Sequence, residues 1–392
     1  MMRILIINKY VPPEPVPTAV LVGDLATILR EKGAEVTLLG AAVGYRGAKP
    51  QGWRRWLHEI QLLLRLLWKG LTAKRPDCIL CLSDPPGVLF AAAILAILKS
   101  TKLVHWAMDV YPDTAVALGE VRAGSLVHRF AGLAMSFGYR SCNLIACLDS
   151  DMLQHLRLRD DQRAFISPPW PPLHISLPEE PVLTPSGRIQ WMYSGNLGRA
   201  HEYETLLRAQ KVLEEAGHPF ELVFQGGGNA WTAARHLAAE LGLQQCRWEN
   251  YASSEDLVPS LLRAHVLIAT QRQQVKGLLW PSKLAVLKLL PKPIVWVGPL
   301  DGSIAADLQS RGGQHGVFGV GDSQGLAAWL AQRAGDFSKM SNITFSPATL
   351  KPVCLSVAHA EGEKWWSHLT QLLLPGTPDG LSLKIPHSGK PA

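Results

Sequence analysis

The sequence predicts an α/β protein of two domains, each built on a parallel sheet with helices on both faces. Short apolar runs without alternation, such as Arg3 to Ile7, recur along the chain and are typical of strands buried on both faces. Most are followed by a helical pattern, which is the rhythm of repeated βαβ units. A proline-rich interval separates two such series, and 392 residues is long for a single core.

The proline-rich interval sets the expected domain boundaries. We expect a first domain over residues 1–167, a linker over 168–187 and a second domain over 188–345. A tryptophan- and leucine-rich pattern predicts a final helix within 346–375, which we expect to pack back on the first domain. Residues 376–392 are rich in Pro, Gly and Ser and are expected to form a mobile tail.

The composition is basic, with a formal net charge of +7 at pH 7, and suggests an anionic partner. Nucleic acid is not expected, because the sequence carries neither a helix-turn-helix signal nor a basic motif interleaved with aromatics. No apolar run reaches the roughly 18 residues of a membrane-spanning helix, and the chain opens into a strand rather than a signal peptide. We therefore expect a cytoplasmic location. Cys78 and Cys81 lie in an apolar strand pattern and are expected to be core thiols rather than metal ligands.

The first βαβ unit has an unusual loop. The strand Arg3 to Ile7 is followed by residues 8–18, which contain four prolines, then by a helical pattern over 19–32 and a strand over 35–39. A dinucleotide-binding fingerprint would place glycines in this loop. The prolines instead predict a rigid cleft edge.

The segment 53–75 has an unusual composition for a helix on a sheet. It combines three tryptophans and many leucines with six basic residues and a single acid, Glu59. Helices of this kind lie at membrane interfaces, where the apolar face enters the bilayer and the cations meet anionic lipids. An ordinary amphipathic helix docked on the sheet explains the same pattern equally well.

Polar residues follow the next two predicted strands of the first domain. Ser83 and Asp84 follow one strand, and Asp109 and Tyr111 follow the other. Ligands of open α/β sheets bind beyond the carboxyl ends of the strands, so these four residues are expected to face a cleft. Asp109 is the best candidate for a functional carboxylate, with capping of the following turn as the alternative.

Residues 149–151 read Asp-Ser-Asp, a spacing that can hold a divalent metal. They stand between a predicted strand over 143–148 and a helical pattern. Capping of the helix amino end is the favoured explanation of this spacing.

The second domain opens with an apolar strand that ends in residues 194–201, Ser-Gly-Asn-Leu-Gly-Arg-Ala-His, followed by a helical pattern. Gly195 and Gly198 would let a diphosphate approach the backbone closely. The new helix would offer unpaired N–H groups, and Arg199 and His201 would add donors. A plain glycine turn is the alternative.

A second segment of this domain is a candidate for the same anion. Residues 277–284 read Gly-Leu-Leu-Trp-Pro-Ser-Lys-Leu, and Ser282 and Lys283 are expected to begin a helix. Two helix starts joined by Arg199 and Lys283 would form a diphosphate clamp. The run Gly226 to Gly228 could also bring backbone close to a ligand, but a plain tight turn is favoured there.

Three phrases of the sequence, 193–201, 280–284 and 109–113, resemble those of GT-B glycosyltransferases in the family 4 group that builds bacterial surface polysaccharides. The order of elements is similar to that group over roughly residues 2 to 375. The resemblance implies two Rossmann-like domains facing each other across a cleft, with a nucleotide-sugar held mainly by the second. It also implies a metal-independent, configuration-retaining transfer, without a cofactor, to an acceptor bound by the first.

The resemblance assigns roles to individual residues. Asp109 would lie at the reacting centre or on the acceptor hydroxyl. Glutamates usual in the group are replaced by Leu278 and Val286, and its usual histidine by Met108, for which nearby His105 is the candidate substitute. The residues expected at the donor diphosphate are Gly195, Asn196, Arg199, His201, Ser282 and Lys283.

These observations together predict a hexosyltransferase-type enzyme at the inner face of the plasma membrane. It would move a sugar from a nucleotide-sugar to a growing surface glycan on a polyprenyl-diphosphate lipid, with Ser83, Asp84 and Tyr111 lining the acceptor cleft. An anionic membrane surface would be a further partner. Two alternatives share the architecture: a catalytically silent GT-B partner or scaffold protein, and a sugar-nucleotide epimerase.

Overall fold

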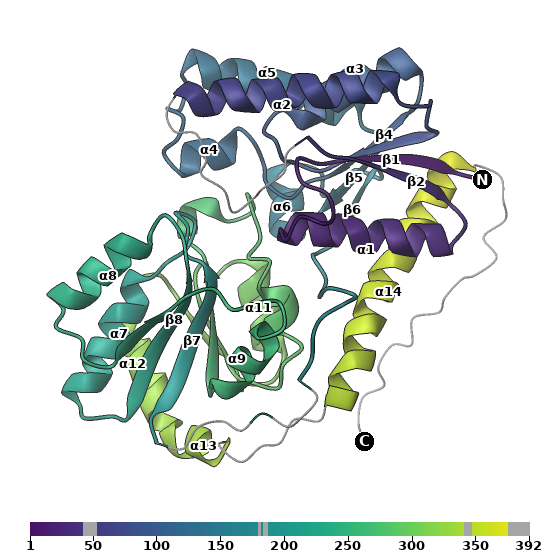
Figure 1. Ribbon diagram of the computed structural model, residues 1–392. Helices are drawn as coiled ribbons and strands as arrows, with labels where there is room; N and C mark the ends of the chain where they lie inside the picture. The colour runs from purple at the N-terminus through teal and green to yellow at the C-terminus, as the bar shows by residue number, and fades with distance from the viewer. Residues whose placement is uncertain (42–52, 179–181, 183–186, 341–346, 375–392) are drawn as a thin grey trace.

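The computed structural model describes residues 1–41, 53–178, 182, 187–340 and 347–374. The chain forms two α/β domains, each with a six-stranded parallel sheet, that lie against each other (Figure 1). The predicted fold class is therefore confirmed. The expected tail and parts of the expected linker lie outside the described residues.

The sheet of the N-terminal domain has the order β2-β1-β3-β4-β5-β6. Its inner strands β3 and β5 are buried along their whole length, and β1 and β4 at every residue but the first, as the continuous apolar runs predict. Cys78 and Cys81 both lie in β3 and have no exposed surface, so they are core thiols. The strands are β1 (Arg3–Ile7), β2 (Glu35–Leu39), β3 (Cys78–Cys81), β4 (Lys102–Trp106), β5 (Leu144–Cys147) and β6 (Ala164–Ile166).

Helices cover both faces of this sheet. In Figure 1, α2, α3 and α5 form the layer at the top, while α1 and α14 lie below. Gly70 and Gly138 hold the upper layer together closely, since a Cβ added there would come within 2.4 Å of Leu95 Cδ2 and 2.6 Å of Leu89 Cγ, respectively. The helices are α1 (Pro17–Glu31), α2 (Trp53–Thr72), α3 (Val88–Lys99), α4 (Asp113–Ala117), α5 (Leu126–Ser141), α6 (Ser150–His155) and α14 (Pro347–Leu373).

The sheet of the C-terminal domain has the order β12-β11-β10-β7-β8-β9. In Figure 1, α7, α8 and α12 lie on one side of it and α9 and α11 on the other. The strands are β7 (Ile189–Asn196), β8 (Phe220–Gly227), β9 (Cys246–Glu249), β10 (Val266–Thr270), β11 (Ile294–Val297) and β12 (Gly316–Phe318). The helices are α7 (Glu204–Glu215), α8 (Trp231–Glu240), α9 (Leu257–Arg263), η1 (Gln273–Val275), α10 (Leu284–Leu287), α11 (Ser303–Ser310), α12 (Ser323–Gln332) and α13 (Ala334–Lys339).

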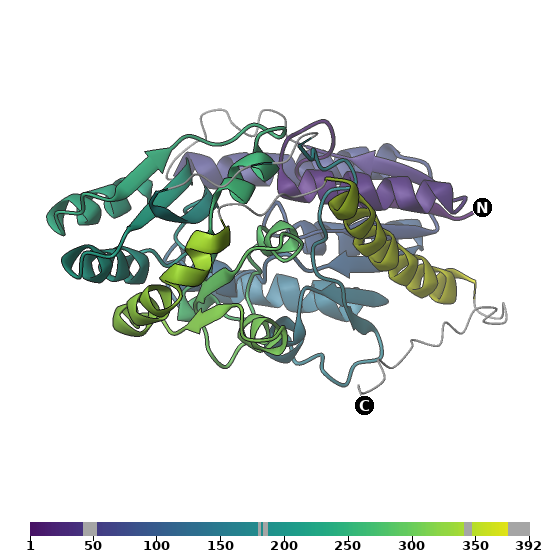
Figure 2. The same cartoon turned by 90° about the horizontal axis from the view of Figure 1, so that it is seen from below.

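The last helix, α14, returns to the N-terminal domain. Its Trp365 ring lies 4.9 Å from the ring of Trp106 in β4, and the Trp365 indole N–H donates to Ser167 Oγ at 2.9 Å. Figure 2 shows α14 running beside α1. The helix occupies Pro347–Leu373 of the interval 346–375, and its tryptophans lie in its second half. None of the described helices combines the length and hydropathy that crossing a bilayer requires.

Candidate functional site

The glycine turn after β7 is required by the packing of the protein itself. Gly195 pairs with Gly226 of β8, and their φ angles are +130° and +135°. A Cβ on Gly226 would lie 2.2 Å from the carbonyl oxygen of Gly195, and one on Gly227 would lie 3.0 Å from the ring of Tyr251. The paired glycines therefore leave backbone without side chains near the carboxyl ends of β7 and β8. A diphosphate could approach such a surface closely. Gly226 and Gly227 extend β8, and Gly228 follows it, so the run does not form the tight turn that was favoured.

The amino end of α7 is not available to a phosphate. A loop over 197–203 separates the turn from the helix, which begins at Glu204. Glu202 Oε1 accepts hydrogen bonds from the Thr205 amide at 3.0 Å and from the Thr205 hydroxyl at 3.2 Å. Because a carboxylate already caps the first turn, the expected contribution of the α7 N–H groups was wrong.

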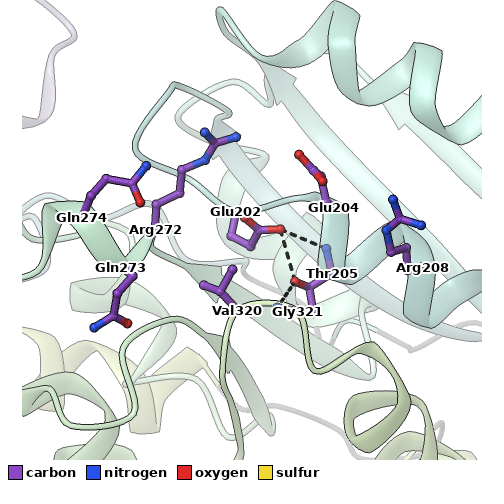
Figure 3. Close-up of a pocket in the computed structure, with 9 residues that line it drawn as sticks. All are labelled: Glu202, Glu204, Thr205, Arg208, Arg272, Gln273, Gln274, Val320 and Gly321. Carbon is purple, nitrogen blue, oxygen red and sulfur yellow. Dashed lines mark hydrogen bonds between the residues drawn. The ribbon is translucent and has the colours of Figure 1, made fainter. Parts of the chain in front are cut away.

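A cavity of about 300 Å³ lies behind this loop (Figure 3). At its walls, the Gly321 amide donates to Thr205 Oγ1 of α7 at 2.8 Å, and Arg272 Nε donates to the His201 carbonyl oxygen of the loop at 3.2 Å. The loop is thus anchored to the segment after β10, and the first turn of α7 to the segment before α12. The residues that line the cavity are Glu202, Glu204, Thr205, Arg208, Arg272, Gln273, Gln274, Val320 and Gly321.

Lys283 places its ammonium beside the glycine turn. A Cβ on Gly195 would lie 3.5 Å from Lys283 Nζ, and Nζ is 3.2 Å from the centroid of the Tyr193 ring. The Nζ atom is buried and has no hydrogen-bond partner in the described structure. Burial lowers the pKa of Lys283 well below its ordinary value. A cation–π contact offsets only part of the cost of burying an ammonium, so this site favours an anion.

His201 lies near Lys283 but cannot act as a second cation. Its Nδ1 is 2.9 Å from the Thr270 carbonyl oxygen, which only accepts, so Nδ1 carries the proton and Nε2 has the free lone pair. Burial, followed by the nearby Lys283, lowers the pKa of His201 to about 3. His201 therefore offers an acceptor near the turn rather than the expected donor.

The other expected donor-site residues are more exposed. Arg199 NH1 reaches the Leu118 carbonyl oxygen of the N-terminal domain at 3.5 Å. Asn196 Oδ1 accepts from the Tyr251 hydroxyl at 3.3 Å. Ser282 is exposed and precedes α10, which has only four residues, so this helix adds little dipole to the site.

Asp109 of the N-terminal domain contacts the segment 277–284, which carries Lys283. It forms a β-bridge with Leu279, and its amide donates to Ser83 Oγ at 3.2 Å. Ser83 is buried and also accepts from the Met108 amide at 2.9 Å, so it fixes the backbone of the Asp109 segment. Burial, and then the nearby Asp84, raises the pKa of Asp109 to about 7. Asp109 therefore titrates near neutral pH.

His105 does not join the site. It has no exposed surface, its Nδ1 lies 3.0 Å from the Cys81 carbonyl oxygen, and its ring packs edge-on against Tyr139 of α5. Burial lowers its pKa to about 4. A central position in β4 directs this side chain toward the helix layer, so His105 does not replace the missing histidine at position 108.

Sequence reasoning missed two residues at the carboxyl ends of the strands. Lys9 Nζ lies 2.6 Å from Glu59 Oε1 and 3.7 Å from Asp84 Oδ1, which brings α2 to the loop after β1. Tyr251, which follows β9, is half-exposed beside the glycines of β8. Both are single residues in loops without a motif, and only the order of the strands brings them near the other groups.

Comparison with known proteins rests on the structure alone. No family model and no curated protein sequence matches this chain. Solved structures align over nearly the whole length. HepE of Anabaena in complex with UDP-glucose has a TM-score of 0.61 at 13% identity, over 95% of this chain and 100% of that one. Sucrose-phosphate synthase from Thermosynechococcus elongatus has a TM-score of 0.65 at 12% identity, over 94% and 100%.

The chain has the GT-B fold. The same fold is shared by a candidate UDP-N-acetylglucosamine 2-epimerase from Listeria monocytogenes, with a TM-score of 0.55 at 11% identity over 94% of this chain and 96% of that one. The fold therefore accommodates more than one reaction on nucleotide-sugars.

The Asp-Ser-Asp segment joins the two GT-B domains. Asp149 Oδ1 accepts from the Met152 amide at 2.8 Å and so caps α6, as expected. Asp149 Oδ2 accepts from Ser303 Oγ and Asp151 Oδ2 from the Ser303 amide, each at 2.7 Å, at the start of α11. Within the described residues, no group of three or more His, Cys, Asp or Glu side chains is placed to hold a metal.

The two substituted positions of the GT-B resemblance present no polar side chain. Leu278 is 4% exposed, and its carbonyl oxygen accepts from the Val110 amide at 2.8 Å across the domain interface. Val286 packs on the hydrophobic core. Any contact of this region with the sugar or ribose must come from other residues.

Proposed function

We propose that the protein is a glycosyltransferase that moves a sugar from a nucleotide-sugar to a lipid-linked glycan acceptor. The observation that carries the proposal is the buried Lys283 ammonium, which lies without a hydrogen-bond partner beside the bare backbone of Gly195. A diphosphate at this position would supply the missing acceptors. As the glycosidic bond breaks, the leaving nucleoside diphosphate gains negative charge, which a fixed cation stabilises.

The surrounding residues fit the rest of such a donor. Tyr251 lies along the glycines of β8, where its ring can stack on a nucleobase. Asp109 reaches the same region from the other domain and is assigned to the acceptor hydroxyl, whose proton its ionised form would take. We propose transfer without a metal and with retention of configuration. Support for the first point is that both aspartates of the Asp-Ser-Asp segment already accept hydrogen bonds from Ser303.

A lipid-linked acceptor and a peripheral position on an anionic membrane are proposed from the outer face of α2, α3 and α5. Large apolar side chains point to solvent from all three helices, among them Trp68 at 69% and Leu126 at 71% exposure. On α2, Leu62 and Leu66 are buried against the sheet while a second apolar stripe faces outward beside the cations Arg65 and Lys69. The outward residues are Leu57, Ile60, Leu64, Trp68, Leu71, Phe90, Ile97, Leu98, Leu126, Val127, Phe130, Leu133 and Phe137.

A catalytically silent GT-B partner protein is the second candidate. The apolar side chains of Leu278, which is buried, and Val286, which is partly buried, favour it, because two groups that would contact the donor are absent. An epimerase of the same fold would alter the donor without any acceptor. The three functions therefore differ in what happens to a bound nucleotide-sugar.

A thermal-shift screen of the full chain against UDP, GDP, ADP, CMP and the corresponding nucleotide-sugars tests donor binding. A ligand at about 100 times its dissociation constant adds roughly 2.7 kcal/mol to the free energy of unfolding. We expect one diphosphate class to stabilise the protein and Lys283→Met to lose this response. Lys292→Met is the matched control, because Lys292 is also a buried lysine but precedes the amino end of β11. The absence of a shift with every nucleotide would contradict the proposal.

Turnover assays with the identified donor separate the candidates. Sugar transfer to a polyprenyl-diphosphate glycan with an unchanged anomeric configuration by NMR supports the proposed reaction. Donor binding without turnover supports the silent partner, and a changed sugar without acceptor supports the epimerase.

Flotation with anionic liposomes tests the membrane surface. We expect Trp68→Glu and Phe130→Glu to release the protein, because each puts a charge on the apolar outer face. Leu300→Glu is the matched control, since Leu300 is 55% exposed on the other domain. Equal release by all three variants, or by none, would contradict this surface.

A further inference from the structure

We propose that a second cavity, in the N-terminal domain, binds the phosphate of a membrane lipid headgroup. The cavity has a volume of about 550 Å³ and lies between α5, α6 and the segment 110–113 that follows Asp109. It is separate from the Lys283 region of the other domain. The inference rests on the proposed membrane location and names the lipid group that this face of the protein would recognise.

The cavity carries positive charge that the protein does not neutralise. Arg129, Arg140 and Arg157 line it, and none of the three forms an ion pair within the described residues. The other charged groups of the wall are already paired. Arg163 NH2 lies 2.7 Å from Asp161 Oδ2, and His155 Nε2 lies 2.8 Å from Asp113 Oδ2. Three arginines without carboxylate partners match the charge and the multiple acceptors of a phosphate.

The hydroxyl of Tyr139 provides an independent indication of a ligand. Tyr139 lines the cavity from α5, and its hydroxyl oxygen is buried with no hydrogen-bond partner in the described structure. The ring is held in place by its edge-on contact with His105, 5.4 Å between centroids. The hydroxyl itself is buried behind the wall, so a phosphate oxygen that entered deeply enough to meet it would supply the missing partner.

The position of the cavity on α5 favours a lipid over a soluble phosphate compound. Successive helical residues are about 100° apart, so Leu126, Phe130, Leu133 and Phe137 share the exposed apolar face of α5. The flank formed by Arg129, Ser136 and Arg140 borders both this face and the cavity. The apolar face continues onto α3, where Phe90 contacts Phe137 with ring centroids 5.8 Å apart. A phosphate in the cavity would therefore leave its acyl or prenyl chain over this apolar surface.

Vesicle binding of the full chain tests the inference. The vesicles contain phosphatidylcholine alone, phosphatidylcholine with phosphatidic acid, or phosphatidylcholine with polyprenyl phosphate. We expect Arg129→Glu/Arg157→Glu to bind the last two about tenfold or more weakly, because two of the three phosphate-facing cations are reversed. Arg159→Glu is the matched control. Arg157→Glu alone is measured beside it, because Arg159→Glu makes the same charge change two residues away, but Arg159 donates to Gln154 and does not line the cavity.

The two lipids distinguish the possible sources of the phosphate. A preference for polyprenyl phosphate assigns the cavity to the acceptor lipid, and equal binding assigns it to the anionic phospholipid. Equal weakening by Arg159→Glu would reduce the effect to general surface charge and overturn the inference. A thermal shift with inorganic phosphate or pyrophosphate that requires Arg129 and Arg157, without a vesicle preference, would assign the site to a soluble phosphate and also overturn it.

Tyr139→Phe separates a binding role from a structural one. We expect phosphate-lipid binding to weaken several-fold while the melting temperature of the free protein stays equal or rises, because the variant removes an unpaired buried hydroxyl. Unchanged lipid binding would contradict a role of the hydroxyl. None of these variants touches the Lys283 region, so the response to nucleotides should persist in all of them. Failure of the donor proposal and failure of the lipid proposal are thus observed in different assays.

Discussion

Lys283 and Asp109 lie in different domains, each beyond the carboxyl ends of parallel strands, and their charged groups are buried in different ways. The Lys283 ammonium is buried against Tyr193 without a hydrogen-bond partner, and burial lowers its pKa. The Asp109 segment is fixed by Ser83 and Leu279, and burial raises the Asp109 pKa to about 7. Both shifts favour the neutral form. The Lys283 Nζ has no hydrogen-bond partner in the described structure, whereas the contacts made at Asp109 fix its backbone. The comparison teaches that the C-terminal domain is prepared for an anion, whereas the N-terminal domain holds a carboxyl group poised to titrate.

The largest expected effect would come from removing the Asp109 carboxyl group. We expect Asp109→Asn to lower turnover by about 10²–10⁴-fold, because a positioned proton acceptor is lost, while nucleotide binding persists. In the unsubstituted enzyme kcat/KM should rise with pH through about 7, the pKa of Asp109. Steady-state kinetics from pH 5 to 9 measure both effects. Loss of nucleotide binding in Asp109→Asn would contradict the assignment of donor binding to the C-terminal domain and of proton transfer to Asp109.

A smaller effect should appear in the pH dependence of stability, with opposite signs for the two groups. The folded pKa of Asp109 lies above its unfolded value, so its burial costs stability increasingly from about pH 4 to about 7, and the gain in Asp109→Asn grows over that range. The folded pKa of Lys283 lies below its unfolded value, so the gain in Lys283→Met shrinks as the pH rises toward about 10. We expect a gain of up to roughly 4 kcal/mol for Asp109→Asn at pH 7, and a gain for Lys283→Met that is largest at low pH.

Urea denaturation of the nucleotide-free protein at pH 5, 7 and 9 measures these gains. Lys292→Met controls for the removal of a buried lysine elsewhere in the same domain. If the stability gains of Asp109→Asn and Lys283→Met changed with pH in the same direction, the opposite pKa shifts assigned to the two groups would be contradicted.

The smallest expected effect concerns the contact that brings the two regions together. Ser303→Ala removes the hydrogen bond from Ser303 Oγ to Asp149 Oδ2 but keeps the backbone bond to Asp151. We expect a loss of about 1 kcal/mol in the free energy of unfolding and a melting temperature lower by a few degrees. Ser310→Ala is the matched control, because Ser310 Oγ bonds only within α11, to the Asp307 carbonyl oxygen. Equal losses in the two variants would show that the Asp149 bond adds nothing to domain docking.

Part of the site could be predicted from the sequence. The turn at Gly195 and the lysine at position 283 were expected near one anion, and the structure places Lys283 Nζ beside Gly195. The sequence motif does not show that Glu202 caps α7 or that Thr270 takes the proton of His201. Both outcomes depend on hydrogen bonds between segments that are adjacent only in the folded sheet, so local propensity does not predict them.

The N-terminal domain shows the same limit. The composition of 53–75 favoured a membrane helix and a docked helix equally. The structure shows that α2 is docked, with Leu62 and Leu66 inward, and that Trp68 faces outward, while contact with a membrane stays a prediction. The sequence provided no reason to place Arg157, Tyr139 and Arg129 around one cavity. Arg129 and Tyr139 come from α5, which precedes β5, and Arg157 comes from the turn after α6, which follows β5. Only the packing of these two helices around the end of β5 brings the three side chains together.

The sequence by itself determined the repeated strand and helix pattern, the two domains and the glycine turn, because each follows from the hydrophobicity and backbone freedom of nearby residues. Only the tertiary structure decided which charges are paired and which are buried alone. That choice depends on distances between residues far apart in the chain, such as Asp109 and Leu279, and on how much water the surrounding packing removes. The chemistry proposed for this protein rests on those buried groups.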